Sequence, residues 1–317
     1  MDFLKQIADK KGKIDFLIVG DSIGDGSSAD STETKWASLL RARLQEKYGC
    51  EVTVTNVAVG GTESLFGYHT LMRFSDRLKF DAVFVCHGQN DNETVFPTTY
   101  EVLLRGVRRK YPDAYISCFL ESSQRDYTPK IKTIIRLAEK YGCTLIDTIK
   151  AFADSGISYD ELSADGVHVN NKGAAIYAET AFKALTENLK PVSALPDEVD
   201  NKVLSYDYYR FVPKYEMQYA LANYRIKTKA EHISVDCIEA PNAEGYSVFV
   251  NGEKVFENSF KHPFTYVWER VHPVDSPDGE KEIRITLEDE TDVNLLSGII
   301  LMGSTKESIA LKGDEGV

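Results

Sequence analysis

The sequence lacks a long hydrophobic run and any pairing pattern among its few cysteines. Its 317 residues include five cysteines, none of them in a Cys-x-x-Cys pair, so neither a disulfide framework nor a structural zinc site is expected. No apolar stretch approaches the roughly 20 residues that cross a bilayer, and the first fifteen residues have no apolar core of a signal peptide. We therefore expect a cytoplasmic protein with reduced thiols and no membrane partner.

The sequence also has fewer basic residues than acidic ones. The chain has 37 Lys and Arg against 49 Asp and Glu, a formal charge of −12. This charge repels polyanions, and no stripe of basic residues interleaved with aromatics offsets it. One basic cluster, residues 105–110, lies on a predicted helix and is typical of a solvated face. Nucleic acid is therefore not expected as a partner.

The first 190 residues contain a regular alternation of strand-like and helix-like segments. Such alternation predicts βαβ units and a parallel sheet covered by helices on both faces, with the carboxyl ends of all strands at one edge. The predicted strands lie at Phe16–Val19, Glu51–Val57, Asp81–Cys86, Ala114–Leu120 and Thr144–Ile146, and the predicted helices at Glu33–Tyr48, Ser64–Leu78, Tyr100–Lys110, Pro129–Tyr141 and Ala174–Leu189.

From about Lys190 the pattern changes. Two prolines and an acidic stretch at 197–200 indicate a linker, and short alternating runs separated by turn residues follow. These runs are Tyr224–Thr228, His232–Ile238, Tyr246–Val250, Thr265–Arg270 and Glu282–Leu287. Asn251-Gly252 predicts a hairpin turn with positive φ values. We predict an α/β domain over residues 1–192 and an all-β sandwich over residues 193–317.

Ser22 is the candidate nucleophile. The first strand ends at Gly20-Asp21-Ser22, which delivers a hydroxyl to the sheet edge where open α/β folds bind ligands. The run from Gly20 to Gly24 also fits the nucleophile elbow of α/β-hydrolases. In that fold several strands precede the nucleophile, whereas only about one fits before Ser22. A plain Ser/Asp cap on a loop is the alternative without function.

A serine hydroxyl needs a base, a group that orients the base, and donors for the oxyanion. His168 is the candidate base and Asp165, three residues earlier, the candidate orienting carboxylate. The backbone N–H groups of Ser22 and Gly61 and the side-chain amide of Asn90 are the candidate oxyanion donors. Each motif alone is typical of a turn. Their order, each at a strand end or before the last helix, favours one site.

These motifs resemble those of the SGNH (GDSL-type) hydrolases over residues ~14–190. The resemblance rests on four ordered blocks: Gly20-Asp21-Ser22-Ile23, Asn56 with Gly61, Gly88-Gln89-Asn90-Asp91, and Asp165-Gly166-Val167-His168; Trp36 also falls where many members carry tryptophan. It implies a flavodoxin-like α/β/α domain, no metal ion or cofactor, and hydrolysis through an acyl-enzyme on Ser22. Gly60 is the alternative to Gly61 in the oxyanion hole, and Asp21 is an additional candidate site residue.

The sequence indicates less about the substrate than about the fold and the site. Segments 279–285 and 296–301 faintly resemble the jelly-roll domain that certain carbohydrate esterases join to an SGNH domain. Tyr206, Tyr208, Tyr209 and Phe211 either pack at the domain junction, which we favour, or stack on sugar rings. The leading hypothesis is an esterase acting on short-chain acyl esters, acetyl esters of a small molecule or carbohydrate first among them. The alternatives are an acyltransferase acting on a polysaccharide precursor, a lipase or thioesterase, and a noncatalytic glycan-binding module. The oligomeric state is left open.

Overall fold

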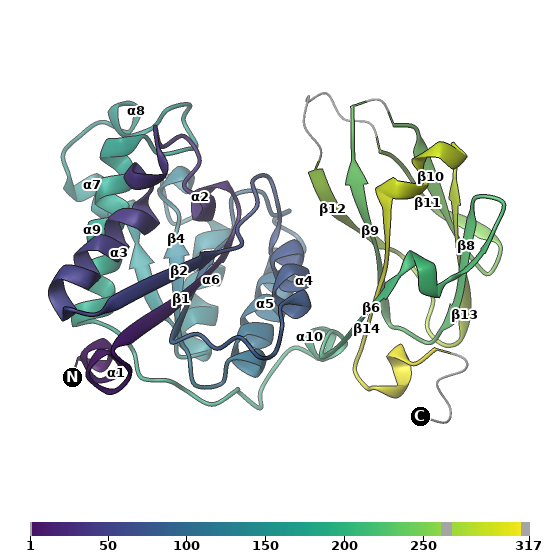
Figure 1. Ribbon diagram of the computed structural model, residues 1–317, viewed down its shortest axis with the longest axis horizontal. Coiled ribbons are helices and arrows are strands. Elements are labelled where there is room, and N and C mark those ends of the chain that lie inside the picture. Colours follow the sequence, from purple (N-terminus) through teal and green to yellow (C-terminus); the bar gives the residue numbers. More distant parts are fainter. Residues whose placement is uncertain (1, 242, 261–267, 312–317) are drawn as a thin grey trace. The chain divides into compact units, whose positions relative to one another are not determined.

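The computed structural model describes residues 2–241, 243–260 and 268–311. The chain divides into two compact units, residues 1–198 and 199–317. The first contains a helix-covered sheet and the second contains antiparallel sheets (Figure 1). This confirms the predicted fold class of an α/β domain followed by an all-β domain.

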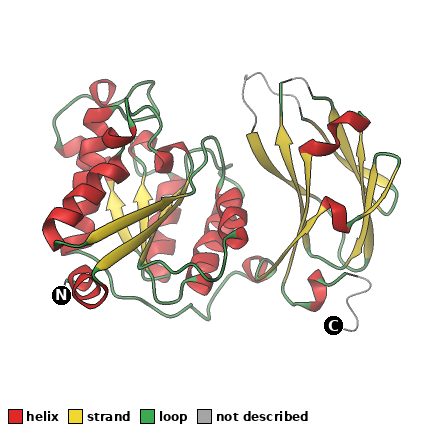
Figure 2. Cartoon of the chain, in the orientation of Figure 1, coloured by secondary structure: helices red, strands yellow, loops and turns green. Residues whose placement is uncertain are grey.

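A five-stranded sheet forms the centre of the first unit (Figure 2). Its strand order is β2-β1-β3-β4-β5. All four pairings between neighbouring strands are parallel, as the strand and helix alternation predicted. Because the strands are parallel, the loops that follow them lie at one edge of the sheet. The strands are β1 (Lys13–Gly20), β2 (Glu51–Asn56), β3 (Ala82–Cys86), β4 (Tyr115–Leu120) and β5 (Thr144–Asp147).

Helices cover both faces of this sheet. On one face α9 packs against α1, α3 and α7, and on the other α5 packs between α4 and α6 (Figure 1). The core of the first face is built around Trp36, Phe84, Phe119 and Tyr177. The helices of this unit are α1 (Phe3–Lys11), α2 (Ser22–Asp25), α3 (Trp36–Tyr48), α4 (Ser64–Arg73), α5 (Phe96–Lys110), α6 (Pro129–Lys140), α7 (Thr148–Asp154), α8 (Tyr159–Leu162) and α9 (Asn171–Glu187).

Four helix boundaries differ from the prediction by three residues or more. Helix α3 begins at Trp36 rather than Glu33, since Thr32–Thr34 form a short 3₁₀ helix. Helix α4 ends at Arg73 rather than near Leu78, because Phe74 takes an extended conformation (ψ 145°). Helix α5 begins at Phe96, four residues early, since Pro97 lies in its first turn, where a missing N–H is tolerated. Helix α9 begins at Asn171 because the Asn170 side chain caps it, accepting from two backbone N–H groups.

The second unit has two antiparallel sheets, in the orders β11-β10-β13-β8-β7 and β12-β9-β14-β6 (Figure 1). One hydrophobic core, with Val212, Tyr246, Ile283 and Ile299 among its members, draws on strands of both sheets. The unit's elements are α10 (Asn201–Leu204), β6 (Tyr208–Pro213), β7 (Gln218–Ala220), β8 (Asn223–Thr228), β9 (His232–Glu239), β10 (Gly245–Val250), β11 (Glu253–Ser259), β12 (Trp268–Val274), β13 (Lys281–Leu287) and β14 (Leu296–Gly303).

The hairpin predicted from Asn251-Gly252 joins β10 to β11, with φ values of 51° and 90° at the two residues. Of the predicted strand Thr265–Arg270, residues 265–267 lie outside the described residues, and β12 begins at Trp268. In the aromatic cluster of the second unit, the Tyr206 ring stacks on the His232 ring with centroids 3.9 Å apart. Tyr206 therefore packs within the second unit.

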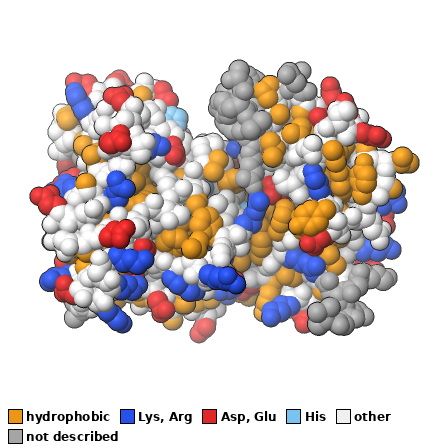
Figure 3. Space-filling view, viewed as in Figure 1, with side chains coloured by type: hydrophobic (Ala, Val, Ile, Leu, Met, Phe, Trp, Pro, Cys, Tyr) orange, Lys and Arg blue, Asp and Glu red, His pale blue; other side chains and the backbone are white. Residues whose placement is uncertain are grey.

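The five cysteines are free thiols, and all but Cys50 are buried. In the part of the chain that the structure describes, no helix is both long and apolar enough to cross a membrane. Figure 3 shows acidic and basic side chains interspersed over the visible face of each unit. The acidic excess is therefore not gathered in one patch on that face.

Gly20 offers a test of how the sheet delivers Ser22. A Cβ at Gly20 would lie 2.7 Å from the Cys86 carbonyl oxygen on β3. We expect Gly20→Ala to lower the free energy of unfolding in urea by about 1–3 kcal/mol, because backbone must shift. Gly12→Ala is the control: its φ is 70° but nothing lies within 4 Å, so about 1 kcal/mol of backbone strain is expected. Equal losses in the two variants would contradict the steric argument.

Candidate active site

Ser22 lies at the carboxyl edge of the parallel sheet, where β1 ends. The Asp21 N–H donates to the Cys86 carbonyl on β3 (2.9 Å), and Asp21 Oδ1 accepts from the Ile23 N–H (2.8 Å). Asp21 thereby caps the short helix α2, whose first residue is Ser22. Gly24 completes the turn, since a Cβ there would lie 3.0 Å from the Cys86 side chain. The two glycines of the Gly-Asp-Ser-Ile-Gly run thus allow close packing beneath Ser22.

His168 and Asp165 come from the loop between α8 and α9. His168 contacts Ser22, which lies 146 residues earlier in the sequence. His168 Nε2 lies 2.9 Å from Ser22 Oγ, and His168 Nδ1 lies 2.6 Å from Asp165 Oδ2. The second oxygen, Asp165 Oδ1, accepts from the N–H groups of Val167 (3.0 Å) and His168 (2.8 Å). The hydrogen bond from His168, with these backbone donors, lowers the pKa of Asp165 to about 2. Asp165 therefore stays ionised at neutral pH.

The loop that carries His168 is held by hydrogen bonds within the loop and by one from Arg125. Ser163 Oγ accepts from the Gly166 N–H (2.8 Å) and donates to the His168 carbonyl (2.9 Å). From the loop after β4, Arg125 donates to the Gly166 carbonyl (3.1 Å), and its guanidinium lies 4.3 Å from the centre of the Tyr159 ring. Arg125 has φ of 61°, a left-handed conformation that costs a non-glycine residue energy. This tie restrains the turn that carries His168.

The three oxyanion candidates lie at neighbouring strand ends. A Cβ built at Gly60 would lie 3.6 Å from Ser22 Cβ, an ordinary van der Waals distance, so the Gly60 backbone lies beside the Ser22 side chain; Gly61 has φ of 73°. Asn90, after β3, donates through Nδ2 to the Thr62 carbonyl (3.1 Å) and to Asp21 Oδ2 (3.3 Å). The Asn90 amide is therefore tied to the residue that precedes Ser22.

Two other motif residues brace helix α2. Asn56, at the end of β2, donates through Nδ2 to the Gly24 carbonyl (3.1 Å) and accepts from the Ala58 N–H (3.0 Å). The buried indole of Trp36 donates to the Ile23 carbonyl (3.0 Å). Both side chains contact the backbone of α2, so we assign them to its support.

A sequence profile of the GDSL-like lipase/acylhydrolase family matches residues 18–176, half of the chain. The chain belongs to this family. It is accordingly a carboxylic ester hydrolase, as the sequence motifs predicted. No curated protein sequence matched it significantly.

Two solved structures resemble this GDSL family member across both of its units. One is a two-domain esterase active on acetylated mannans, crystallised with mannopentaose: it is 17% identical, with 95% of each chain covered and a TM-score of 0.78. The other is also a two-domain esterase active on acetylated mannans: it is 17% identical, with 95% of each chain covered and a TM-score of 0.76. At this identity the likeness shows that the two-domain fold is shared.

Behind Ser22 the family member buries three carboxyl groups: Asp21, Asp91 and Glu121. Burial raises the pKa of Asp21 to about 7 and raises the pKa of Asp91 and of Glu121. The nearby acids add to this shift for Asp21 and Glu121, since like charges repel. Asp91 Oδ1 accepts from the Ser64 N–H (2.9 Å) at the start of α4. Ionisation of these three acids near the candidate site is therefore less favourable than ionisation of the same groups in water.

Sequence reasoning missed Arg125, Glu121 and Lys130 as contributors to this site. Lys130, in the first turn of α6, donates to the carbonyls of the loop that carries Asn90. Arg125 and Lys130 have no distinguishing sequence pattern, because charged residues are common in loops and in first helical turns. Only Glu121 had a signal: it directly follows the apolar strand β4, as Asp21 follows β1.

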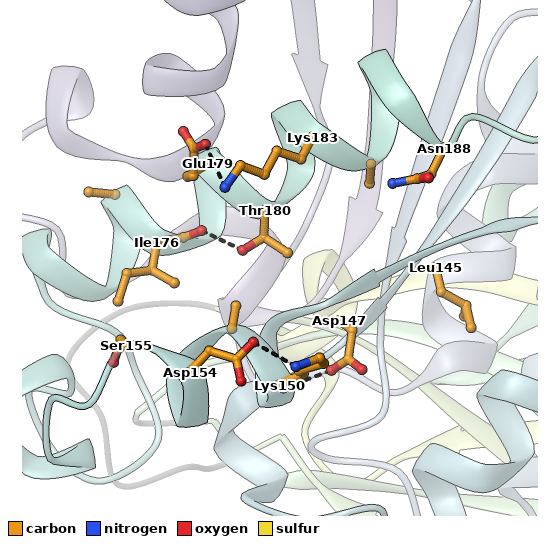
Figure 4. A pocket seen from close by; sticks show the side chains of 13 residues that line it. Leu145, Asp147, Lys150, Asp154, Ser155, Ile176, Glu179, Thr180, Lys183 and Asn188 are labelled. Carbon is orange, nitrogen blue, oxygen red and sulfur yellow. Dashed lines mark hydrogen bonds and ion pairs between the residues drawn. The ribbon is translucent and has the colours of Figure 1, made fainter.

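A groove with other lining residues is present elsewhere in the first unit. About 620 Å³ in volume, it lies between α7 and α9, as Figure 4 shows. The ion pairs Lys150–Asp154 and Lys183–Glu179 line it. None of the predicted site residues is among its lining residues. Separately, no group of three or more potential metal ligands occurs among the described residues.

Glu121 generates a pH-dependent prediction. In the unfolded chain a glutamate loses its proton near pH 4.3, whereas burial keeps Glu121 protonated in the folded protein well above that pH. Rising pH therefore favours the unfolded state by up to about 1.4 kcal/mol per pH unit. We expect the free energy of unfolding of Glu121→Gln, minus that of the wild type, to increase from about pH 5 to about pH 7.

Urea denaturation at several pH values measures this difference. Glu139→Gln is the matched control, because Glu139 is an exposed glutamate on α6 and its substitution removes the same charge from the surface. Parallel stability curves for Glu121→Gln and the wild type would contradict the prediction.

Proposed function

We propose that this GDSL family member hydrolyses short-chain acyl esters, acetyl esters of a carbohydrate first among them, through an acyl-enzyme on Ser22. The observation that carries the proposal is the continuous hydrogen-bonded chain from Ser22 Oγ through the His168 imidazole to the Asp165 carboxylate. A nucleophile, a base and an orienting group in hydrogen-bond contact are the arrangement that activates a serine.

In the proposed first step, Ser22 Oγ attacks the acyl carbonyl carbon while its proton passes to His168 Nε2. The tetrahedral intermediate collapses, the bond between the acyl carbon and the alcohol oxygen breaks, and His168 returns the proton to that oxygen. A water molecule then attacks the acyl-enzyme, giving one proton to His168. Release of the acid restores the Ser22 hydroxyl with that proton. Throughout, Asp165 accepts a hydrogen bond from the Nδ1–H group of His168 and stabilises the imidazolium.

For the oxyanion we assign the Ser22 and Gly61 N–H groups and the Asn90 side-chain amide, with Gly60 as the alternative to Gly61. The close approach of Gly60 to the Ser22 side chain supports this stretch of backbone as a source of oxyanion donors. Asn90 donates at present to Thr62 and Asp21, at 3.1 and 3.3 Å. Such long hydrogen bonds can yield to a charged oxygen in the transition state.

The choice of a carbohydrate ester rests on the whole-chain likeness to the esterase active on acetylated mannans. In this proposal residues 1–192 are the catalytic domain and residues 193–317 the accessory domain. Transfer of the acyl group to a sugar acceptor uses the same acyl-enzyme. Product analysis with a sugar acceptor present distinguishes hydrolysis from transfer, because hydrolysis gives only free acid.

The first test compares the wild type with Ser22→Ala on p-nitrophenyl acetate, butyrate and octanoate and on acetylated sugars. We expect Ser22→Ala to lower kcat by about 10⁶-fold, since the nucleophile is lost. We also expect the wild type to release acetate faster than the longer acids and to deacetylate the sugars. Undiminished turnover by Ser22→Ala would rule out the acyl-enzyme. A preference for octanoate would favour a lipase instead.

The second test is Asp165→Asn. The substituted amide would point an N–H₂ group at His168 Nδ1 and hold the wrong tautomer, so kcat should fall on the order of 10⁴-fold. The pH–rate profile of the wild type supplies an independent check. Because the pKa of Asp165 is about 2, activity lost between about pH 4 and pH 7 should not arise from its protonation. Near-normal kcat in Asp165→Asn would remove Asp165 from the mechanism.

A further inference from the structure

Lys130 makes an unusual set of contacts at the base of the candidate active site. Its Nζ donates to the carbonyl oxygens of Gly88 (2.5 Å), Gln89 (3.1 Å) and Asp91 (3.1 Å). An ammonium group has three hydrogens, so these contacts can use all of them. The three carbonyls belong to the residues that flank Asn90 in the loop after β3.

This loop is also held from its sides by the Asn90 side chain, which donates to Thr62 and Asp21, and by the Asp91 side chain, which accepts from the Ser64 N–H. The loop turns at Gly88, whose φ of 144° is one that L side chains rarely adopt. Its carbonyls converge on one point, where they repel each other unless a cation or several donors lie between them. The Gln89 side chain adds one lateral tie, accepting from Ser123 (2.7 Å) and Gln124 (2.9 Å). Lys130 is therefore the group at the centre of the turn.

The far side of the same loop faces Ser22. The Asn90 amide donates to Asp21 Oδ2 and to the Thr62 carbonyl, and Asp21 caps the helix that begins with Ser22. A backbone shift around Asn90 would move its amide relative to Ser22. A displacement of about 1 Å in a catalytic donor is enough to cost on the order of 10²-fold in rate.

We propose that Lys130 is a positioning residue: by binding the three carbonyls around Asn90, its ammonium fixes the Asn90 amide where it stabilises the oxyanion formed at Ser22. The inference rests on the proposed function and deepens it. The competing explanation is that Lys130 only supplies positive charge near the buried acids Asp91 and Glu121. The two explanations differ in whether Lys130 acts through Asn90.

A double-mutant cycle tests this, with kcat and KM measured on p-nitrophenyl acetate for the wild type, Lys130→Met, Asn90→Ala and the double variant. Removing an oxyanion donor should lower kcat about 10²–10³-fold. Lys130→Met should lower kcat about 10- to 100-fold with KM changed less than about 3-fold. Adding Lys130→Met to Asn90→Ala should cost less than about 3-fold more, because the group it positions is gone.

Lys110→Met is the matched control. Lys110, on α5, also binds a backbone carbonyl, that of Phe74 (2.7 Å), but at the end of α4 and with no contact to the Asn90 loop. Its kcat should equal that of the wild type. Lys130→Arg covers the case in which Lys130→Met fails to fold. It keeps the positive charge, but its planar donors cannot direct three N–H bonds from one atom, so kcat should still fall several-fold.

Wild-type kcat in Lys130→Met or in Lys130→Arg would overturn the positioning role. Losses that multiply fully in the double variant would overturn it as well, since Lys130 would then act independently of Asn90. Ser22→Ala in the same assay separates the two proposals. Its inactivity together with full activity of Lys130→Met refutes only the role of Lys130, whereas activity of Ser22→Ala refutes both.

Discussion

The hydrogen bond between His168 Nε2 and Ser22 Oγ is the contact on which the candidate site depends. It joins residues that lie at opposite ends of the first unit's sequence, and neither loop alone determines its length. Ser22 is placed by the end of β1 and by the packing of Gly20 and Gly24 against β3. His168 is placed by a closed loop fastened to the region after β4 through Arg125. The parallel sheet brings these two supports to the same edge.

Electrostatics adds a second constraint. A carboxylate buried without full compensation costs several kcal/mol, yet Asp21, Asp91 and Glu121 are buried behind Ser22. Part of the compensation is visible: backbone N–H groups donate to Asp21 and Asp91, and Lys130 lies near Asp91 and Glu121. The pKa values rise because this compensation is incomplete. The three buried acids therefore lower the free energy of unfolding. They do so beneath the candidate site, where rigid polar groups are useful for catalysis.

The sequence predicted a parallel sheet and the polar residues that follow its strands, but not the hydrogen bonds between its loops. Apolar runs that end in Gly, Ser, Asn or Asp mark strand ends, and parallel topology brings strand ends together, so Ser22 and Asn90 could be grouped. His168 could be added from its place just before the last helix of the α/β domain. Contacts of Arg125 and Lys130 could not, because a long side chain on a loop or first helical turn leaves no periodic signal. The end of α4 was misplaced because residues 74–78 continue its composition after the backbone has turned extended at Phe74.

Asn90 connects the two constraints. Its amide can donate two hydrogen bonds, and at rest both go to acceptors inside the site: the Thr62 carbonyl and the Asp21 carboxyl group. An oxyanion forming at Ser22 would compete with Asp21 for one of these hydrogens. Because burial raises the pKa of Asp21 to about 7, this carboxyl group holds its charge weakly near neutral pH. A neutral Asp21 is a poorer acceptor than a carboxylate, so it releases the Asn90 hydrogen at lower cost. Asp21 and Asn90, the proposed oxyanion donor, are thus parts of one hydrogen-bond arrangement.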